Sequence, residues 1–232
     1  MAFAMISFSS CEKWAGDPIT QEFNISGNYT ELDVSDAFNV SVSDEVTRAV
    51  VTAGDNVMSK VRVEINDNTL KIYLKGWNIN TGKMTVLLPY NPNLTKVDLS
   101  GASDFRSNFA LTGHEVEIEV SGASDFYGFV NAEELELDLS GSSDATIEGV
   151  VGELDMNISG SSDLVQKIVD HRYSLACSTC KCSISGSSDA FIHCDNAITG
   201  SVSGSSSLNY TGNASTSGCS VSGSSSVVHD VL

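Results

Sequence analysis

A phrase of five residues, Ser-Gly-(Ala or Ser)-Ser-(Asp or Ser), occurs seven times in this chain and constrains its fold more than any other feature. The copies begin at Ser100, Ser121, Ser140, Ser159, Ser185, Ser203 and Ser222. Most successive copies start at nearly the same interval; the step from Ser159 to Ser185 is clearly longer, and the step from Ser100 to Ser121 is slightly longer. A similarity that recurs at such a period predicts one structural unit that is stacked on copies of itself.

The residues before each phrase alternate between apolar and polar side chains. The position directly before the phrase is aliphatic in every copy: Leu99, Val120, Leu139, Ile158, Ile184, Val202 and Val221. The positions two and four residues further back are also mostly apolar, whereas the residues between them are mostly polar. Alternation with a period of two predicts a strand with one buried face. The Gly of the phrase then permits a tight polar turn.

A second apolar stretch follows each turn, as at residues 126–127 and 145–147. A strand, a turn and a second strand within one repeat form one coil of a parallel β-helix. We therefore predict an all-β chain that winds as a single-stranded parallel β-helix, a solenoid. A leucine-rich repeat has a similar period but needs a Leu-rich frame and usually a helix in each unit. A β-sandwich gives no reason for one turn to recur in register.

Three segments follow from this pattern. Residues 94–232 carry the repeats, and residues 12–93 are β-rich without the phrase, so we expect them to form irregular first coils or a cap continuous with the repeats. Residues 1–11 form a third, separate segment. The long step between the phrases at Ser159 and Ser185 indicates an insertion, which we place at 166–176. Insertions in solenoids emerge as loops.

Residues 1–11 are too few to span a bilayer but resemble the end of a secretion signal. Small residues before Cys11 resemble a bacterial lipoprotein cleavage site, at which this Cys becomes the lipidated N-terminus. We therefore expect a periplasmic or outer-membrane lipoprotein in the envelope of a Gram-negative bacterium, held at the membrane only through this anchor. An ordinary frayed N-terminus is the alternative.

The charge of the chain limits its partners. The formal net charge is −18, from 30 acidic residues against 12 Lys and Arg. This balance argues against nucleic acid as a partner, because phosphate binding needs a basic surface. Outward positions of the predicted strands form an acidic strip: Asp98, Glu117, Glu119, Glu136, Asp138 and Asp155. Such a strip is either a solvated sheet face or a docking surface for a cationic or hydroxyl-rich ligand.

The repeats resemble a known bacterial family. The residues that carry the resemblance are Ser-Gly-Ala-Ser-Asp-Phe at 100–105 and 121–126, Ser-Gly-Ser-Ser-Asp at 140–144, 159–163 and 185–189, and Asp-Ala-Phe-Asn-Val-Ser-Val at 36–42. The family is the putative auto-transporter adhesin, head GIN domain. The resemblance covers about residues 20–230 and implies a right-handed β-helix in the envelope of Bacteroidetes-like bacteria. It implies no catalytic residues, because no reaction is tied to the family. The chain departs from it in its Cys cluster and in the insertion.

The last residue of the phrase is the first candidate for binding. It is Asp104, Asp125, Asp144, Asp163 and Asp189, and then Ser207 and Ser226. If the coils are in register, these carboxylates form a column with a spacing of about 4.8 Å. Such a column repels itself unless its members accept hydrogen bonds, are partly protonated, or hold a cation such as calcium. A hydrogen-bonded turn ladder and a calcium site are therefore both open.

The cysteines are the second candidate. Cys177, Cys180, Cys182 and Cys194 resemble a tetrahedral zinc set in their spacing. Cys180 and Cys182, however, fall on the inward positions of a predicted strand, where Cys behaves as a small apolar residue. Core packing, a disulfide such as Cys177–Cys194, and a zinc site all remain open.

The sequence contains no strong signal for catalysis. No Gly-x-Ser-x-Gly elbow lies between a strand and a helix. Lyases and hydrolases need paired carboxylates and a nearby base. We predict a non-catalytic binding, adhesion-like or structural module with a flat acidic surface, no cofactor, and an extracellular glycan or envelope protein as partner. A polysaccharide-active enzyme that uses carboxylates on the helix face is the alternative, and a self-associating scaffold is a third hypothesis.

Overall fold

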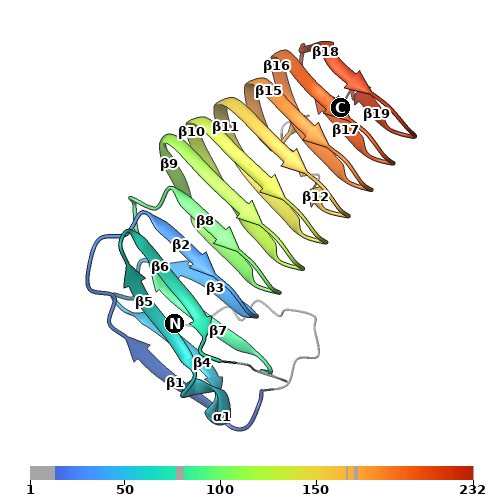
Figure 1. Ribbon diagram of the computed structural model, residues 1–232. Helices are drawn as coiled ribbons and strands as arrows, with labels where there is room; N and C mark the ends of the chain where they lie inside the picture. Colours follow the sequence, from blue (N-terminus) through green and yellow to red (C-terminus); the bar gives the residue numbers. More distant parts are fainter. Residues whose placement is uncertain (1–13, 77–80, 166, 170–171, 232) are drawn as a thin grey trace.

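The computed structural model describes residues 14–76, 81–165, 167–169 and 172–231. In these residues, seventeen strands form one mostly parallel sheet that winds along the length of the molecule (Figure 1). The strands of this sheet are β1 Pro18–Phe23, β2 Glu31–Val34, β3 Phe38–Ser43, β4 Ala49–Gly54, β5 Val61–Asn66, β6 Thr69–Leu74, β7 Met84–Pro89, β8 Lys96–Leu99, β9 Asp104–Val120, β10 Asp125–Leu139, β11 Asp144–Ile158, β12 Asp163–Leu164, β15 Leu175–Ile184, β16 Asp189–Val202, β17 Ser207–Thr211, β18 Ser215–Val221 and β19 Ser226–His229. The fold is therefore all-β, as the alternation predicts.

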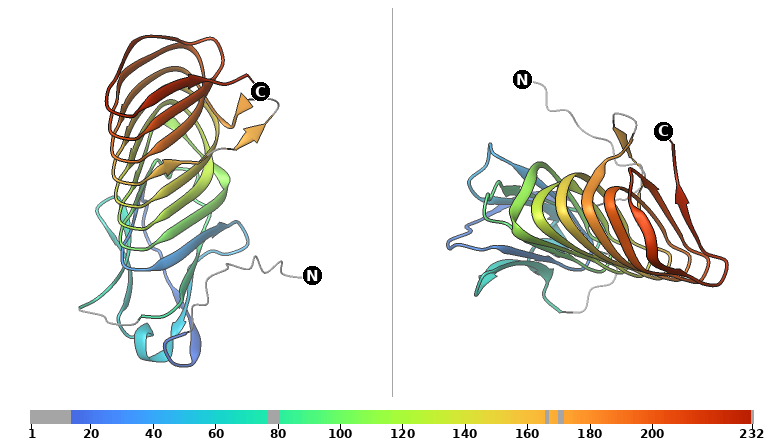
Figure 2. Two further views of the ribbon diagram at one scale, coloured as in Figure 1. Left: turned by 90° about the vertical axis from the view of Figure 1, so that its right-hand side faces the viewer. Right: turned by 90° about the horizontal axis from the view of Figure 1, so that it is seen from above.

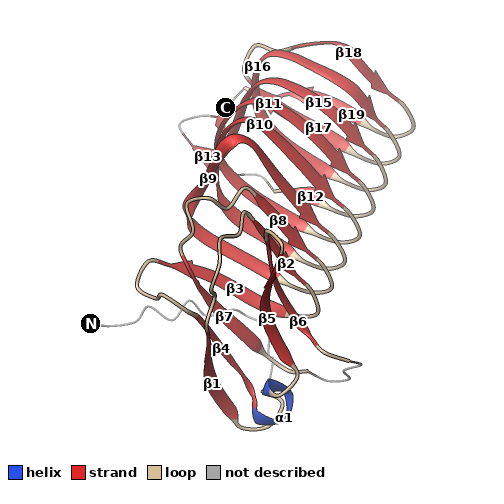
Figure 3. Ribbon diagram, turned by 60° about the vertical axis from the view of Figure 1, so that its left-hand side comes forward, coloured by secondary structure: helices blue, strands red, loops and turns tan. Residues whose placement is uncertain are grey.

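Helical structure is almost absent from the described residues. One short helix, α1 Asp55–Met58, lies at the N-terminal end of the molecule (Figure 3). No described helix has the length and hydropathy needed to cross a membrane.

The aliphatic residues that precede the phrases form one column through the stack. Each pairs in parallel with its counterpart in the next coil: Leu99 with Val120, Val120 with Leu139, Leu139 with Ile158, Ile158 with Ile184, Ile184 with Val202, and Val202 with Val221. The column is buried from Leu99 to Val202, whereas Val221 in the last coil is 48% exposed. The prediction that the phrases stack in register is confirmed.

A coil in the middle of the stack consists of one long curved strand and one turn (Figure 2). In β10 we call the part before Glu133 the first arm and the part after it the second arm. Phe126 and Val130 point into the core from the first arm. Leu135, Leu137 and Leu139 point into it from the second arm. The equivalent residues of neighbouring coils pack above and below them. Each fully buried aliphatic side chain contributes about 1.5–3 kcal/mol to stability, which offsets the entropy lost on ordering the coil.

The Gly of the phrase fits the turn for two reasons. Gly122 has φ +78, in the left-handed region that residues with a Cβ avoid. A Cβ at this position would also lie 2.4 Å from the carbonyl oxygen of Gly101 in the preceding coil. The backbone N–H of Ala123 donates to that same carbonyl at 2.8 Å, so the close approach is part of the ladder that joins the coils.

The fourth residue of the phrase, a Ser in every copy, forms a buried column that the alternation did not predict. Its members from the first six phrases are almost fully inaccessible: Ser103, Ser124, Ser143, Ser162, Ser188 and Ser206. Hydroxyls in this column accept hydrogen bonds from the backbone N–H of the counterpart in the preceding coil. Examples are Ser103 N to Ser124 Oγ at 3.1 Å and Ser143 N to Ser162 Oγ at 3.2 Å. Because their hydroxyls have hydrogen-bond partners, these polar side chains can line the core.

The N-terminal region contains one coil that lacks the repeated phrase. Strands β2 and β3 pair in parallel with β8 and β9, so Val34 lies opposite Leu99 and Asn39 lies opposite Asp104. Asp36 takes the place of the turn Gly with φ +74. The signal was present as alternating apolar residues followed by Ser-Asp-Ala, but the Gly that defines the phrase is missing.

The chain then turns back and adds strands on the other side of this coil. Strand β6 pairs in parallel with β2, and β7 pairs in parallel with β3. Strands β5, β4 and β1 join antiparallel, β5 to β6, β4 to β7 and β1 to β4. The order of the strands in space therefore differs from their order in the sequence. The sequence pattern alone does not predict this rearrangement.

The predicted insertion is present. Strands β13 Ile168–Val169 and β14 Arg172–Tyr173 form an antiparallel hairpin outside the main sheet. Ala145 on β11 pairs with Leu164, whereas Gly149, further along the same strand, pairs with Leu175 beyond the hairpin. The separation in sequence between paired residues therefore grows within this coil. The extra residues lie between Leu164 and Leu175, close to the predicted position.

Candidate functional site

The predicted column of aspartates exists and is hydrogen-bonded between coils. Asp104, Asp125, Asp144 and Asp163 pair in register. Asp189 continues the column, because its backbone N–H donates to Asp163 Oδ1 at 2.8 Å. The Ser207 hydroxyl in turn donates to Asp189 Oδ1 at 2.5 Å. These contacts are those of a turn ladder, one of the two open interpretations of the column.

The column also concentrates negative charge. Burial, and next the like charges of Asp125 and Asp163, raise the pKa of Asp144 above its ordinary value. Among the described residues, no three His, Cys, Asp or Glu side chains are placed to hold one metal ion together. Calcium binding by the aspartates stays an open alternative to the predicted absence of a cofactor.

A larger group of carboxylates covers the second arm of three successive coils. We call this group the acidic panel. Its members are Glu115, Glu117 and Glu119 on β9, Glu134, Glu136 and Asp138 on β10, and Glu153 and Asp155 on β11. The register places them in three columns, with Glu134 paired to Glu115 and to Glu153, and Glu136 paired to Glu117 and to Asp155. Five of the six predicted strip residues belong to it, and Asp98 pairs with Glu119 at its edge.

Two lysines border the acidic panel. Lys96 contacts Glu117 and Glu119 at 2.7 Å each, and Lys181 contacts Asp155 at 2.6 Å. Burial opposes the charge of Lys96, but the hydrogen bonds to the two glutamates outweigh it and raise the pKa of Lys96. The central carboxylates lie outside these ion pairs.

The centre of the panel therefore concentrates like charges. Partial burial raises the pKa of Glu136, and the like charges of Glu115, Glu134, Asp155 and Asp138 raise it further. A cation placed here would relieve this repulsion. Electrostatically, the panel is suited to bind positive charge.

The three columns of the acidic panel carry no carboxylate in the following coils. The three columns of the panel continue into hydroxyl, small and amide side chains, apart from Lys181. These residues are Asn157, Thr179, Ser183, Ala197, Thr199 and Ser201. The negative charge of the face thus ends at β11.

The cysteines belong to the core. Cys177, Cys180, Cys182 and Cys194 are buried and free. Cys177 and Cys194 lie opposite each other on neighbouring coils, and no disulfide joins them in this structure. The spacing that suggested zinc does not bring these thiols together as a metal set. Cys180 and Cys182 lie on the inward positions of β15, opposite Leu154 and Met156. They pack there as small apolar residues, the first of the three interpretations.

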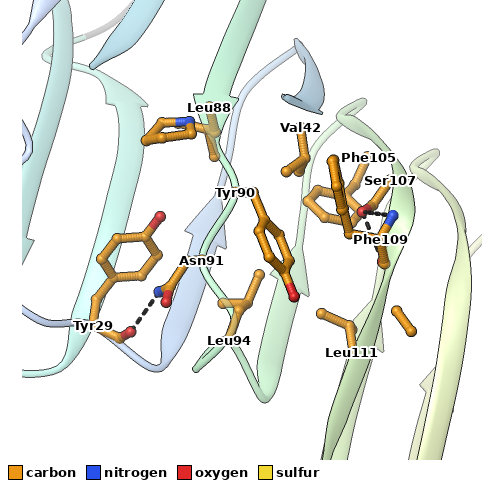
Figure 4. A pocket seen from close by; sticks show the side chains of 12 residues that line it. Tyr29, Val42, Leu88, Tyr90, Asn91, Leu94, Phe105, Ser107, Phe109 and Leu111 are labelled. Carbon is orange, nitrogen blue, oxygen red and sulfur yellow. Dashed lines mark hydrogen bonds between the residues drawn. The ribbon is translucent and has the colours of Figure 1, made fainter. Parts of the chain in front are cut away.

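A cleft that no sequence motif predicted lies where the N-terminal strands meet the repeats. Its walls include Tyr29, Tyr90, Asn91 and Phe109 (Figure 4). The Tyr90 and Phe109 rings stack with centroids 4.4 Å apart. The only hint in the sequence was the slightly long first step between phrases.

Cys11, the predicted lipidation site, lies outside the described residues.

Comparisons with known proteins show the family, through a family model, and the fold, through solved structures. A family model described as putative auto-transporter adhesin, head GIN domain, matches residues 28–214. A putative adhesin of Bacteroides fragilis has a similar structure, with a TM-score of 0.77 and 19% identity over 92% of this chain and 97% of that chain. A putative adhesin of Parabacteroides merdae has a TM-score of 0.67 and 20% identity over 94% of this chain and 98% of that chain. A structure from Parabacteroides distasonis, described as a putative lipid binding protein, has a TM-score of 0.64 and 21% identity over 94% of this chain and 98% of that chain. The comparison with curated proteins finds no match.

Proposed function

The chain belongs to the putative auto-transporter adhesin, head GIN domain family, and from that premise we propose that it is a non-catalytic binding module of the bacterial cell envelope. Its backbone is a right-handed parallel β-helix, a solenoid that presents a flat face. Its acidic panel binds a cationic partner, for which a basic segment of an envelope protein is the best match.

The observation that carries this proposal is the grid of carboxylates. Three columns cross three coils, so the negative charges recur about every 4.8 Å across the strands and roughly every 6.8 Å along them. An extended basic segment with Lys or Arg at alternate positions has the same spacing along its length. A rigid grid favours such a partner because the protein loses little entropy on binding.

The arrangement supports binding better than catalysis. Retaining and inverting glycosidases use two carboxyl groups that flank the scissile bond. The panel carboxylates instead point out of one sheet face, side by side, and reach a ligand from the same direction. The family and the similar structures are described as adhesins or as lipid binding, so they lend no support to the enzyme alternative.

Calorimetric titration with a hexalysine peptide tests the proposal. In the panel variant, Glu115, Glu134, Glu136 and Glu153 are each replaced by Gln, which leaves the Lys96 and Lys181 ion pairs intact. We expect affinity to fall by about tenfold or more, and the binding of the natural protein to weaken as salt is raised.

The matched control removes the same number of charges from exposed positions of the N-terminal region. It carries Asp44→Asn, Glu45→Gln, Glu64→Gln and Asp67→Asn. We expect its affinity to change less than about twofold. An equal loss in both variants would show that net charge alone attracts the peptide and would overturn the assignment of the panel.

We also propose that the chain is anchored through a lipidated Cys11, which the small residues before this Cys support. Mass spectrometry of the mature N-terminus from a Gram-negative host tests this directly. A diacylglyceryl group on Cys11 is the expected result, and an unmodified thiol within an intact N-terminus would contradict it.

A further inference from the structure

A second, wider hollow shares Tyr29, Pro89, Tyr90 and Asn91 with the narrow cleft beside Phe109, and we call it the neutral cleft. It belongs to the N-terminal region and has a volume of about 170 Å³. The residues that line it are Ile25, Gly27, Asn28, Tyr29, Thr47, Pro89, Tyr90, Asn91 and Asn93. None of them is charged, although the chain carries 30 acidic residues. The cleft therefore combines amide and hydroxyl groups with an aromatic wall and suits a neutral ligand.

Tyr90, an aromatic wall of this cleft, is supported by a local irregularity of β9. Between the pairs Arg106–Tyr127 and Ala110–Phe129, three residues of β9 lie opposite one residue of β10. The two extra residues account for the slightly long step between the first two phrases. Bulges commonly redirect a side chain next to a functional site. Here the bulge turns Phe109 out of the strand pattern and against the ring of Tyr90.

Hydrogen bonds hold the bulge in place. Ser107 is 5% exposed, and its hydroxyl donates to the carbonyl of Phe109 at 2.9 Å. The same hydroxyl accepts from the backbone N–H of Phe109 at 3.0 Å. Tyr90 is 40% exposed, so one part of its ring is supported by Phe109 and another part stays accessible to a ligand.

The loop on the other side of Tyr90 is also fixed. The Asn91 side chain donates through Nδ2 to the Tyr29 carbonyl at 2.8 Å and accepts through Oδ1 from the Asn93 backbone N–H at 3.0 Å. Such an Asx turn sets the direction of the following residues. The exposed amides of Asn28 and Asn93 and the exposed hydroxyl of Thr47 are then positioned around the cleft.

We propose that this cleft binds one neutral sugar ring, with the apolar C–H face of the ring against Tyr90 and its hydroxyl groups on the amides of Asn28 and Asn93. Amides supply both donors and acceptors, which a ring of hydroxyl groups requires. The volume is below the roughly 300–1,000 Å³ of sites for drug-sized molecules, so the cleft takes a single ring of a larger glycan. The residues involved are separate from the acidic panel, so the two proposals stand or fall independently.

Saturation-transfer NMR on the full chain tests the proposal, with glucose, galactose, mannose, fucose and N-acetylglucosamine offered one at a time. We expect transfer to the ring protons of at least one sugar. Tyr90→Ala should weaken this binding by about tenfold or more, because the stacking wall is lost. Tyr90→Phe keeps the ring and should bind within about twofold of the natural protein.

Two further variants test whether the loss of sugar binding is specific to the cleft. Tyr73→Ala removes a tyrosine on β6 that lies outside the cleft and bonds Glu64, and it should leave sugar binding unchanged. Asn93→Asp adds a charge at the cleft wall and should reduce binding of the neutral sugars. No transfer to any of the five sugars, or equal transfer in the natural protein and Tyr90→Ala, would overturn the proposal. Circular dichroism melting confirms that each variant is folded.

Discussion

Two parts of the stack share one backbone but carry different chemistry. The coils of β9 to β11 present the acidic panel, whereas the coils of β15 and β16 continue the same columns with Ser, Thr, Ala and a single Lys. Along the second arm, the pairing register continues through both parts. The backbone ladder and the inward side chains therefore determine the fold, and the outward columns are free to vary with function.

The two parts also differ inside. Leu135, Leu137 and Leu139 fill the second arm of β10, whereas Cys180 and Cys182 occupy the first two of these positions in β15. Gly200 follows in the column of Leu137 in β16. Because smaller side chains bury less apolar area, the later coils gain less from the hydrophobic effect.

The largest expected effect comes from a charge in the shared aliphatic column. Leu139→Asp places a carboxylate among buried neighbours and should lower the free energy of unfolding by about 4 kcal/mol or more. Val221→Asp is the matched control, because this residue lies in the same column but is 48% exposed in the last coil. We expect that change to cost about 0.5 kcal/mol. Urea denaturation measures both, and similar losses would contradict the burial difference along the column.

An intermediate effect is expected at the turn that both parts share. Gly141→Ala and Gly204→Ala each meet a positive φ and a carbonyl 2.5 Å from the new Cβ, so each should cost about 3 kcal/mol. Gly76→Ala has φ +91 but open space around the Cβ, and should cost about 1 kcal/mol. Thermal and urea unfolding give these values. A loss at Gly204 close to that of Gly76 would show that the later coils are not held by the same turn.

The smallest effect concerns the charge that distinguishes the two parts. The raised pKa of Glu136 means that the folded state favours its protonated form, so the ionised form lowers stability above about pH 4. Glu136→Gln should therefore raise the melting temperature at pH 7 by roughly 1 °C, and this gain should vanish as the pH falls below about 4.

Ser183→Ala provides the control for this pH effect. It changes an exposed position of the same face in the neutral coils and should shift the melting temperature equally at both pH values. A gain for Glu136→Gln that persists in acid would mean that it does not arise from charge.

Periodicity made part of the fold predictable from the sequence. The column from Leu99 to Val202, the inward cysteines and the insertion all follow from the alternation and from the spacing of the phrase. The coil of β2 and β3 lacks the phrase because Asp36 stands where the phrase has Gly, and Asp can also adopt a positive φ. The sequence therefore predicted only irregular first coils or a cap in this region.

The candidate sites were less predictable because they depend on contacts between distant segments. The acidic panel follows from register once the coils are known. The cleft proposed to bind a sugar does not, since Tyr90 in the loop after β7 is held by the ring of Phe109 in a bulge of β9. Neither segment carries a motif, and the slightly long interval between the phrases at Ser100 and Ser121 was the only sign of the bulge in the sequence. The state of Cys177 and Cys194 was equally hidden, because the spacing of cysteines says nothing about whether neighbouring thiols are oxidised.

Amide shift mapping by NMR tests the central claim that binding resides in the acidic coils and not in the shared backbone. With isotope-labelled protein and the hexalysine peptide, we expect the largest shifts at Glu115–Glu119, Glu134–Asp138 and Glu153–Asp155, and little change in the second arms of β15 and β16. Shifts spread evenly over both parts of the stack, or centred on the Ser and Thr coils, would contradict it.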